Sequence, residues 1–367
     1  MIRLPHCARR ARTTLFLLTL LAVVAGSASS ASATFTPQGP KVKVMTRNMY
    51  FGADLTRAIV AGNIPDLLTA NAQIFTNVQG SDIPNRAKSV AREIALERPN
   101  LVGLQEVSQW LSGPINDPAA ATAVEYDQLD SLLYWLKRYG APYNVVKSQT
   151  EIQIEAPAGA PYYKDFRLVD RDVILAPVYG YPKLTLSNAA AGNFATNLTI
   201  PAFFGPVLVT RGWVSVDAST GGQHFRFVNT HLESFHPGVR AAQAGELVAA
   251  AGPVGSAPGK AVLVGDINSD PNQAFPDNAA FGTLLLGGLT DTWAAINPGN
   301  PGLTCCFNEL LNDPTPVGVF NQRIDHALTK GAIGVTHANL VGLSPYNRTS
   351  GGLWPSDHAG VVTTLTP

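Results

Sequence analysis

Charged residues are scarce in this chain of 367 residues, and neither sign is in excess. Asp, Glu, Lys and Arg make up 14% of the sequence, with 26 basic and 26 acidic residues. A protein that holds a polyanion by bulk charge carries a clear excess of Lys and Arg. The balance therefore excludes that mode of binding, but it leaves room for a nuclease that works through a local basic patch.

Cysteine is also rare, with three in the chain, and Cys7 lies in the N-terminal leader described below. Cys305 and Cys306 are neighbours. Adjacent Cα atoms across a trans peptide lie about 3.8 Å apart, below the usual disulfide range of about 4.4–6.8 Å. Export would permit oxidation. Two alternatives therefore stay open, namely a strained vicinal disulfide that clamps a loop and a pair of buried thiols.

Long apolar runs are missing as well. The run Leu15–Ala25 is shorter than the roughly 20 residues that a membrane-spanning helix needs. It follows several arginines and precedes Ala31-Ser32-Ala33. A basic region, a short apolar core and an A-x-A site are typical of a secretory signal peptide. We therefore predict a signal at residues 1–33 and a secreted protein, extracellular or periplasmic, with an uncleaved anchor as the alternative.

Cleavage after Ala33 would leave a mature chain with four more acidic than basic residues, because the leader holds four arginines and no acid. The hydrophobic content of 46% is ample for a large core. We find neither an internal repeat nor a linker that would divide the mature chain. Residues 34–40 are predicted to be a short linker and residues 41–367 one domain, monomeric and without a stable protein partner.

Short apolar segments bounded by turn residues predict many strands, among them 41–45, 101–104, 225–228 and 261–264. Helical spacing predicts helices near 86–98, 126–139 and 240–251. After the strand at 261–264 we expect a long loop region up to Asp313. Strands and helices alternate early and paired strands dominate the middle, which predicts an α/β protein with sheets inside and helices outside.

The segment Ala261–Pro271 (AVLVGDINSDP) is the most informative one. Its apolar run predicts a buried strand, and Asp266 and Asn268 follow it two positions apart, on one face of an extended chain. A carboxylate that orients water beside an amide that donates to a phosphoryl oxygen suits hydrolysis of a phosphate ester. An Asx-turn that ends the strand is the alternative.

The same pattern recurs along the chain. Six apolar strands end in polar residues able to serve hydrolysis, and strand ends at one edge of a sheet converge on a crevice. These residues are Asn48, Glu106, Asn229 with His231, Asp266 with Asn268, Asp325, and Asp357 with His358. The recurrence predicts one catalytic cleft.

The motifs TRNM, LQEV, NTHLES, GDIN, RIDH and SDH occur in the order found in the endonuclease/exonuclease/phosphatase superfamily, which the chain resembles from about Val42 to its end. GDIN with the terminal SDH is the most specific pair. The resemblance implies a four-layer α/β sandwich, in which two packed, mostly antiparallel β-sheets are flanked by helices, as in DNase I-like proteins.

The resemblance also implies a divalent cation and its ligands. Glu106 corresponds to the main metal ligand, with Asn48 beside it and Asp357 contributing. Oxygen ligands suit Mg²⁺, with Mn²⁺ or another divalent cation as alternatives. Asp266 would activate the attacking water, and Asn268 would donate to the phosphate.

Two histidines complete the implied catalytic set. His358 would contact the phosphate, and Asp325 would orient its imidazole and raise its pKa. His231 resembles a second histidine of the nuclease branch, either a leaving-group acid or a phosphate stabiliser, with Asn229 in support at the phosphate. Asp172 lies where that branch has an acid that pairs with this histidine, and Arg211 where a phosphate-facing arginine often stands. Ordinary salt bridges are the alternative for Asp172 and Arg211.

We therefore predict a secreted, divalent-metal-dependent phosphoesterase that cleaves phosphodiester bonds by direct attack of water. Its substrate would be a nucleic acid or a phospholipid head group, and the run Ile200–Pro206, with two phenylalanines, is a candidate tip that reaches a bilayer. The alternatives are a phosphomonoesterase acting on small phosphate esters and a non-catalytic secreted binding protein on the same fold.

Overall fold

The computed structural model describes residues 39–367 of the chain. The predicted signal peptide, residues 1–33, lies outside the described residues, as does most of the predicted linker 34–40. Within residues 39–367, no helix is both long enough and apolar enough to cross a membrane.

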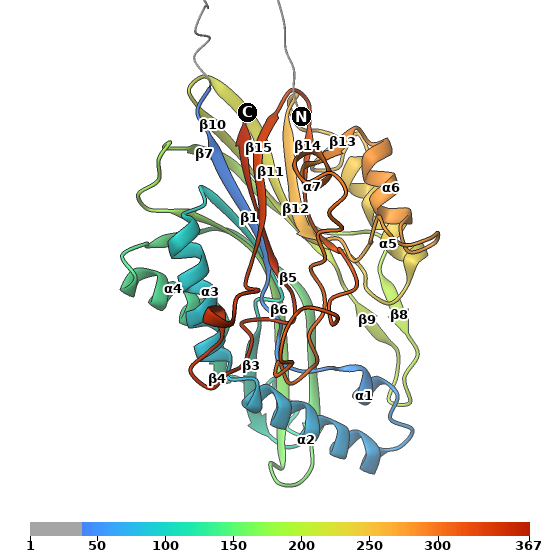
Figure 1. The fold of residues 1–367 in the computed structure, drawn as a ribbon. Helices are drawn as coiled ribbons and strands as arrows, with labels where there is room; N and C mark the ends of the chain where they lie inside the picture. The colour runs from blue at the N-terminus through green and yellow to red at the C-terminus, as the bar shows by residue number, and fades with distance from the viewer. Residues whose placement is uncertain (1–38) are drawn as a thin grey trace, which may run out of the picture. The chain divides into compact units, whose positions relative to one another are not determined.

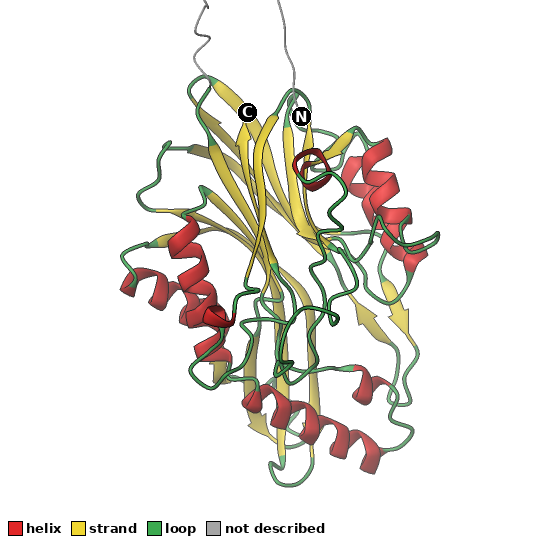
Figure 2. Ribbon diagram, viewed as in Figure 1, coloured by secondary structure: helices red, strands yellow, loops and turns green. Residues whose placement is uncertain are grey.

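Two mixed sheets form the centre of the described chain (Figures 1 and 2). The first has eight strands in the order β15-β16-β1-β2-β6-β3-β4, with β5 also paired to β6. Its pairs are antiparallel except for β1 with β2. Its strands are β1 (Val42–Asn48), β2 (Leu101–Gln105), β3 (Gln109–Pro114), β4 (Ala123–Asp127), β5 (Tyr143–Ala158), β6 (Lys164–Pro177), β15 (Gly334–Val341) and β16 (Gly360–Thr366).

The second sheet has six strands in the order β13-β14-β12-β11-β10-β7. Its pairs are antiparallel except for β11 with β12. Its strands are β7 (Thr185–Asn193), β10 (Gly212–Thr220), β11 (Gln223–His231), β12 (Ala261–Asp266), β13 (Leu289–Asp291) and β14 (Asp325–Lys330). A separate hairpin joins β8 (Leu198–Ile200) to β9 (Val207–Val209).

Three of the apolar clusters that form the core lie between the sheets and on their outer faces. Between the two sheets, Val44 and Leu101 of the first pack against Phe227 and Val264 of the second. On the outer face of the first sheet lie α3 (Ile83–Glu97) and α4 (Gln128–Arg138). On the outer face of the second lie α5 (Pro237–Val248) and α6 (Ala279–Leu286). The four layers, helices on sheet on sheet on helices, are the predicted architecture.

Local sequence accounts for the helices that were predicted. The Asp127 carboxylate accepts hydrogen bonds from the N–H groups of Leu129 and Asp130 and so caps α4. Leu132 and Leu136, four positions apart, are buried on one face of this helix. α3 ends at Glu97 with Arg98 as its C-cap, just before Pro99, which cannot continue a helix.

The expected loop region up to Asp313 is wrong in part, because it holds α6, β13 and α7 (Thr292–Ile296). The α6 sequence AAFGTLLL is apolar on all sides, so it has no amphipathic period that would mark it as a helix. The sequence of β7, TLSNAAAGN, shows the opposite case, since it has no run of large apolar side chains that would predict a strand.

The two parallel strand pairs, β1 with β2 and β11 with β12, each end in polar residues at the carboxyl edge of their sheet. In the first sheet, the carboxyl end of β1 places Asn48 opposite Gln105. In the second sheet, His231 lies opposite Asp266, which in turn lies opposite Asp325. Strand order and register therefore gather the predicted residues at one end of the sandwich.

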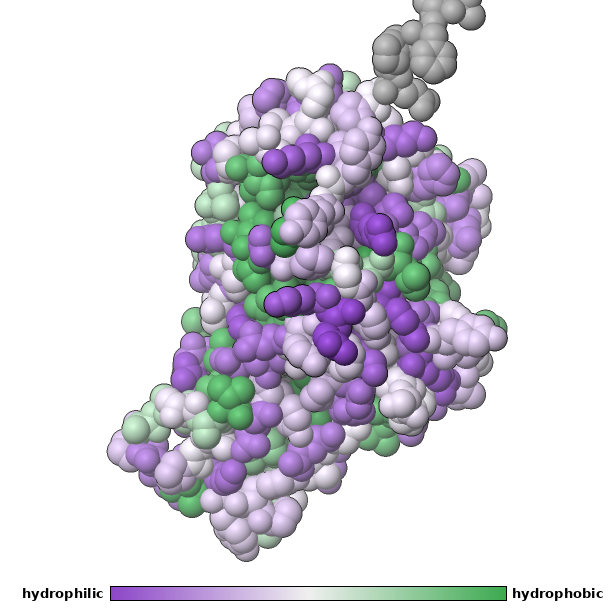
Figure 3. All heavy atoms as spheres, turned by 90° about the vertical axis from the view of Figure 1, so that its left-hand side faces the viewer, coloured by the Kyte–Doolittle hydropathy of each residue, from purple (hydrophilic) through white to green (hydrophobic). Residues whose placement is uncertain are grey.

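Three further elements complete that end: α1 (Thr56–Ile59), α2 (Ile64–Gly80) and the β8–β9 hairpin (Figure 1). α2 packs on the extended part of the first sheet, where Phe75 stacks on Phe166. A 3-10 turn, η1 (Pro345–Asn347), precedes β16. Figure 3 shows the side of the molecule that carries α3 and α4, on which hydrophilic side chains surround apolar patches.

Candidate active site

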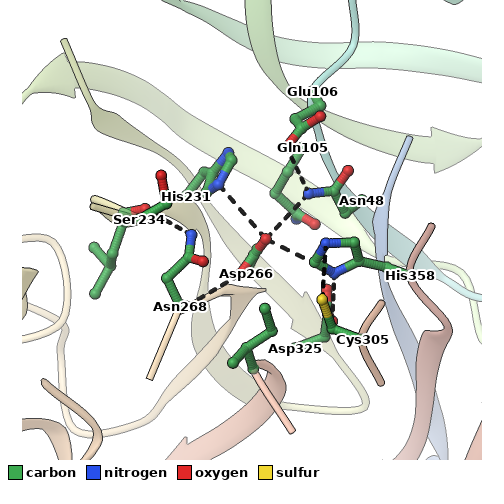
Figure 4. Close-up of polar contacts among 12 residues, drawn as sticks. Asn48, Gln105, Glu106, His231, Ser234, Asp266, Asn268, Cys305, Asp325 and His358 are labelled. Carbon is green, nitrogen blue, oxygen red and sulfur yellow. Dashed lines mark hydrogen bonds and ion pairs between the residues drawn. The ribbon is translucent and has the colours of Figure 1, made fainter. Parts of the chain in front are cut away.

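The predicted residues meet around the carboxylate of Asp266, at the end of β12 (Figure 4). Asn48 Nδ2 donates to Asp266 Oδ2 at 3.0 Å, and the N–H of Asn268 donates to Oδ1 at 3.0 Å. His231 Nε2 lies 3.5 Å and His358 Nδ1 3.8 Å from Oδ2. Burial raises the pKa of Asp266 to about 6, with the charge of His358 opposing this and that of Asp325 adding to it.

His358, just before β16, is held by Asp325 at the start of β14. Its Nδ1 lies 2.8 Å from Asp325 Oδ2. Burial lowers the pKa of His358, but the carboxylates of Asp325, Asp357 and Asp266 outweigh it and hold the pKa well above the usual value. The imidazole is therefore charged at neutral pH. Its Nδ1 donates to Asp325, and its Nε2 lies 3.9 Å from Asp357 Oδ1 on the side of the cavity.

A buried arginine holds the backbone of His358 in place. Arg47 Nη1 donates to the carbonyl oxygen of His358, while Arg47 Nε pairs with Glu93 Oε2 at 3.1 Å. Both Arg47 and Glu93 are fully buried. The arginine of the TRNM motif thus positions the histidine of the SDH motif from the neighbouring strand of the same sheet, a role that sequence alone does not indicate.

His231, at the end of β11, is held by Arg211. Arg211 Nη1 lies 3.0 Å from His231 Nδ1. A guanidinium only donates hydrogen bonds, so Nδ1 is the acceptor and the imidazole proton lies on Nε2. Burial, then the charges of Arg211 and His358, hold the pKa of His231 well below its usual value. His231 is therefore a neutral donor directed at the centre of the site.

This arrangement corrects the prediction for Asp172. Arg211, not an acid, occupies the place beside His231 Nδ1, and the acid that contacts Arg211 is Asp170, with Asp170 Oδ2 3.7 Å from Nη1. Asp172 is buried, and its carboxylate has no hydrogen-bond partner among residues 39–367. Arg211 Nη1 is engaged by His231 and Asp170, whereas its Nε has no hydrogen-bond partner among the described residues. The predicted contact of Arg211 with phosphate therefore stays a prediction.

The prediction for Asn229 does not fit the structure. Its side chain is fully buried between the sheets, where Nδ2 donates to the carbonyl oxygen of Leu104 at 2.9 Å and Oδ1 accepts from Gln105 Nε2 at 2.5 Å. Asn229 and His231 share the face of β11 that looks toward the first sheet, but Asn229 lies two residues deeper in the sandwich, while His231 lies at its edge. It joins the two sheets beneath the site and does not face the phosphate.

Glu106 follows β2 with a positive φ of 54°, a conformation that is rare for residues other than glycine. Asn48 Nδ2 donates to its Oε1 at 3.0 Å, and the N–H of Phe51 donates to its Oε2 at 3.1 Å. Burial, then the nearby charges of Asp357 and Asp170, raise the pKa of Glu106 to about 8.

These features fit a hard divalent cation at Glu106 and Asp357. Burial also raises the pKa of Asp357, although the charges of His358 and Arg86 oppose it, and a cation would relieve the repulsion between the two half-buried carboxylates of Glu106 and Asp357. Asn48 fits less well as a ligand, because its nitrogen faces the carboxylates of Glu106 and Asp266 while its oxygen accepts from the N–H of Tyr50. His231 lies within reach of Glu106 and Asp266, but its Nε2 carries the proton.

The side chain of Asn268 is partly engaged within the protein. Asn268 Nδ2 donates to the carbonyl oxygen of Leu232 at 3.0 Å, so its predicted contact with phosphate would use the remaining N–H.

Cys305 and Cys306 form a disulfide, with their sulfurs 3.7 and 4.0 Å from His358 Nε2. The structure thus shows the first of the two alternatives that the adjacency of these cysteines had left open.

A cavity of about 510 Å³ opens from this cluster. Its polar end contains Glu106, His231, Asp266, Asn268, Asp357 and His358. The rest of its wall is largely apolar and comes from α1, α2, β5, β6 and the β8–β9 hairpin. Asp325 and Asn229 do not line it, in keeping with their positions behind the cluster.

Comparisons with known proteins agree with the motifs. The model of the endonuclease/exonuclease/phosphatase family matches residues 68–358. Danio rerio TDP2, solved in complex with a single-strand DNA product, is 16% identical, with a TM-score of 0.52 over 89% of this chain and 99% of that one. A family member from Bacteroides thetaiotaomicron is 15% identical, with a TM-score of 0.52 over 89% of this chain and 98% of that one.

A third structure, from Beutenbergia cavernae, is 18% identical, with a TM-score of 0.51 over 89% of this chain and 72% of that one. At these identities the likeness establishes the fold and carries nothing about substrate. No curated protein matches the chain. The predicted four-layer fold is confirmed, whereas the individual roles of the site residues stay predictions.

Proposed function

The chain belongs to the endonuclease/exonuclease/phosphatase family and is a hydrolase of phosphate esters, and from this premise we propose a secreted phosphodiesterase that depends on Mg²⁺ or another divalent cation. Enzymes of this family use divalent metals. The observation that carries the proposal is the contact of His358 Nδ1 with Asp325 at 2.8 Å beside the buried carboxylate of Asp266. Export is supported by the leader pattern of residues 1–33.

Asp266 is the residue placed to activate water. With a pKa of about 6 it is mostly ionised at neutral pH, and hydrogen bonds from Asn48 and Asn268 fix its two oxygens. It takes a proton from the water that attacks phosphorus. One P–O bond forms to the water oxygen and one breaks to the leaving alcohol, which takes up a proton.

The two histidines act on the phosphate in different charge states. His358 is an imidazolium whose Nε2–H donates to a phosphoryl oxygen as negative charge builds up there. His231 is neutral, and its Nε2–H donates a hydrogen bond, which favours the role of phosphate stabiliser over that of leaving-group acid. A cation held by Glu106 and Asp357 would supply further positive charge at the phosphoryl group.

The test is hydrolysis of bis(p-nitrophenyl) phosphate and of p-nitrophenyl phosphate by the purified protein, with Mg²⁺ and with EDTA. We expect cleavage of the diester that needs Mg²⁺ and falls by about 100-fold or more in His358→Ala. His224→Ala is the matched control, since His224 is an exposed histidine on the same strand as His231. Preference for the monoester would favour a phosphomonoesterase, and inactivity on both would contradict the proposal.

A further inference from the structure

The polarity of the cavity changes along its length. Its catalytic end is made of the histidines and carboxylates described above. Away from them the wall is formed by large apolar side chains from separate elements, namely Ile59 of α1, Ile74 of α2, Trp110 of β3, Ile154 of β5 and Leu168 of β6. A ligand that fills this space has one phosphate end and one apolar end.

The charges of the wall disfavour a polyanion. Among the described residues that line the cavity, Arg211 is the one Lys or Arg, and it is engaged with His231 and Asp170. Asp54 and Glu309 lie on the same wall, and Glu309 is balanced by Arg57 at 2.7 Å. A nucleic acid strand would bring further phosphates to a surface without free cations, whereas a single phosphodiester needs only the catalytic end.

The β8–β9 hairpin places exposed aromatic side chains beside this cavity. It leaves the second sheet at the catalytic edge, where Asn193 pairs with Gly212. At its turn, Phe203 is 47% and Phe204 42% exposed, and Phe204 also lines the cavity. Phe235, 52% exposed, lines the cavity from the loop after β11. Clustered aromatic side chains of this kind are typical of a surface that dips into the boundary of a lipid bilayer.

We infer that the substrate is a membrane phospholipid, whose phosphodiester reaches the catalytic end while its acyl-bearing part occupies the apolar wall and the β8–β9 hairpin contacts the bilayer. This inference rests on the proposed phosphodiesterase activity. Continuity between the exposed tip, the apolar wall and the catalytic carboxylates is what selects a lipid over a small soluble diester. Hydrolysis adds water across one P–O bond and releases an alcohol and a phosphate monoester.

Three substrates distinguish this inference from the proposed function. They are bis(p-nitrophenyl) phosphate, supercoiled plasmid, and vesicles of phosphatidylcholine, phosphatidylglycerol, phosphatidylinositol and sphingomyelin, all with Mg²⁺. We expect the lipids to be hydrolysed faster than the soluble diester, and the plasmid to be left intact. Cleavage of the soluble diester or of plasmid without cleavage of vesicles would overturn the lipid inference and leave the phosphodiesterase standing. Inactivity on all three would overturn both.

A double variant in the β8–β9 hairpin and a control variant test whether the hairpin contacts the bilayer. Phe203→Ser/Phe204→Ser should lower the ratio of vesicle to soluble-diester hydrolysis about tenfold and reduce sedimentation with vesicles, because two aromatic anchors are lost. Tyr181→Ser is the matched control, since Tyr181 is 98% exposed in the loop after β6, whose carboxyl end lies at the opposite edge of the sheet.

Ala58→Trp, on α1, tests the cavity itself. Ala58 lines the cavity and is only partly buried, at the edge of the apolar cluster around Phe75, so the larger side chain narrows the apolar wall of the cavity. We expect the same ratio to fall about tenfold, while Ala295→Trp on the exposed side of α7 leaves it unchanged. An unchanged ratio in both the hairpin variant and Ala58→Trp would overturn the inference.

Discussion

The charge of His358 depends on the residues that surround it. Desolvation alone would leave a buried imidazole neutral, yet three carboxylates oppose that effect and keep the proton on the ring. His231, a few ångströms away, lies beside a guanidinium and is neutral. Two histidines with different neighbours thus take different charge states, which is how one site provides both an imidazolium and a neutral donor.

The first prediction concerns Asp325→Asn. Asp325 raises the pKa of His358, so its neutralisation lowers that pKa, and the imidazolium is lost at a lower pH. We expect kcat on bis(p-nitrophenyl) phosphate to fall by about 100-fold and the alkaline limb of the pH–rate profile to move to lower pH. A fall in kcat with the limb unmoved would contradict this positioning role. Asp130→Asn, on the exposed face of α4, is the control.

The second prediction concerns Arg211→Met. Without the guanidinium, His231 Nδ1 loses its donor, and a charge that lowers the pKa of His231 is removed. We expect the ¹⁵N chemical shifts of the ring to lose the pattern of a single Nε2–H tautomer, and activity to fall about tenfold. Arg138→Met, an exposed arginine in the last turn of α4, should leave the ring signals unchanged. Wild-type shifts in Arg211→Met would show that another group sets the tautomer.

Among the elements, β2 and β11 come unusually close to each other across the two sheets. A Cβ at Gly103 would lie 2.5 Å from Asn229 Oδ1 and 2.6 Å from a methyl group of Val264, both buried. The absence of a side chain at Gly103 lets Asn229 bond to the backbone of β2. This contact links the strand that leads to Glu106 with the strand that leads to His231.

The third prediction is therefore that Gly103→Ala destabilises the fold by about 2–3 kcal/mol, because neither neighbour has room to move. Gly245→Ala is the matched control. It lies inside α5 with nothing within 4 Å of the new Cβ, and alanine is favoured there by up to about 1 kcal/mol. Urea denaturation measures both, and equal stability of the two variants would show that the sheets can separate at little cost.

At the scale of the whole molecule, the fold brings several carboxyl groups close together where the two sheets meet. Burial and mutual repulsion raise the pKa of Glu106 to about 8, and burial raises those of Asp266 and Asp170 to about 6. The folded protein therefore binds protons that the unfolded chain releases. Such an arrangement favours the bound state of a cation and weakens the metal-free fold.

The fourth prediction follows from the sign of this linkage. Between pH 6.5 and 8, Glu106 and His358 both hold more protons in the folded than in the unfolded state, so stability falls as pH rises. We expect the Tm in EDTA to fall by about 5 °C over this range. Saturating Mg²⁺ should remove most of the fall, because it holds Glu106 in its charged form, and Glu106→Gln should show little dependence on Mg²⁺. A Tm in EDTA that rises with pH would contradict the charge assignment.

The local pattern of the chain was enough to predict much of this protein. Short apolar strands that end in polar residues are visible in the sequence, because strand length, turn residues and buried runs depend on near neighbours. The carboxyl ends of parallel neighbours must meet at one edge, so the convergence of Asn48 with Glu106 and of His231 with Asp266 could be expected from the sequence. His358 joins them because β16 runs antiparallel to β1 and so begins at the edge where β1 ends. The pairing of Asp325 with His358 came from the family resemblance and not from the strand pattern.

Which atoms face each other depended on packing between distant segments. Asp170 and Asp172 share one face of β6, and the position of Arg211 in the folded chain selects Asp170 as its partner. Asn229 and His231 also lie two positions apart, yet one bonds across the sheets and the other reaches the cleft. The apolar cavity combines side chains from α1, α2, β5 and the β8–β9 hairpin. No local pattern contains such contacts, because they arise from sheet stacking and register, which bring together residues more than a hundred positions apart.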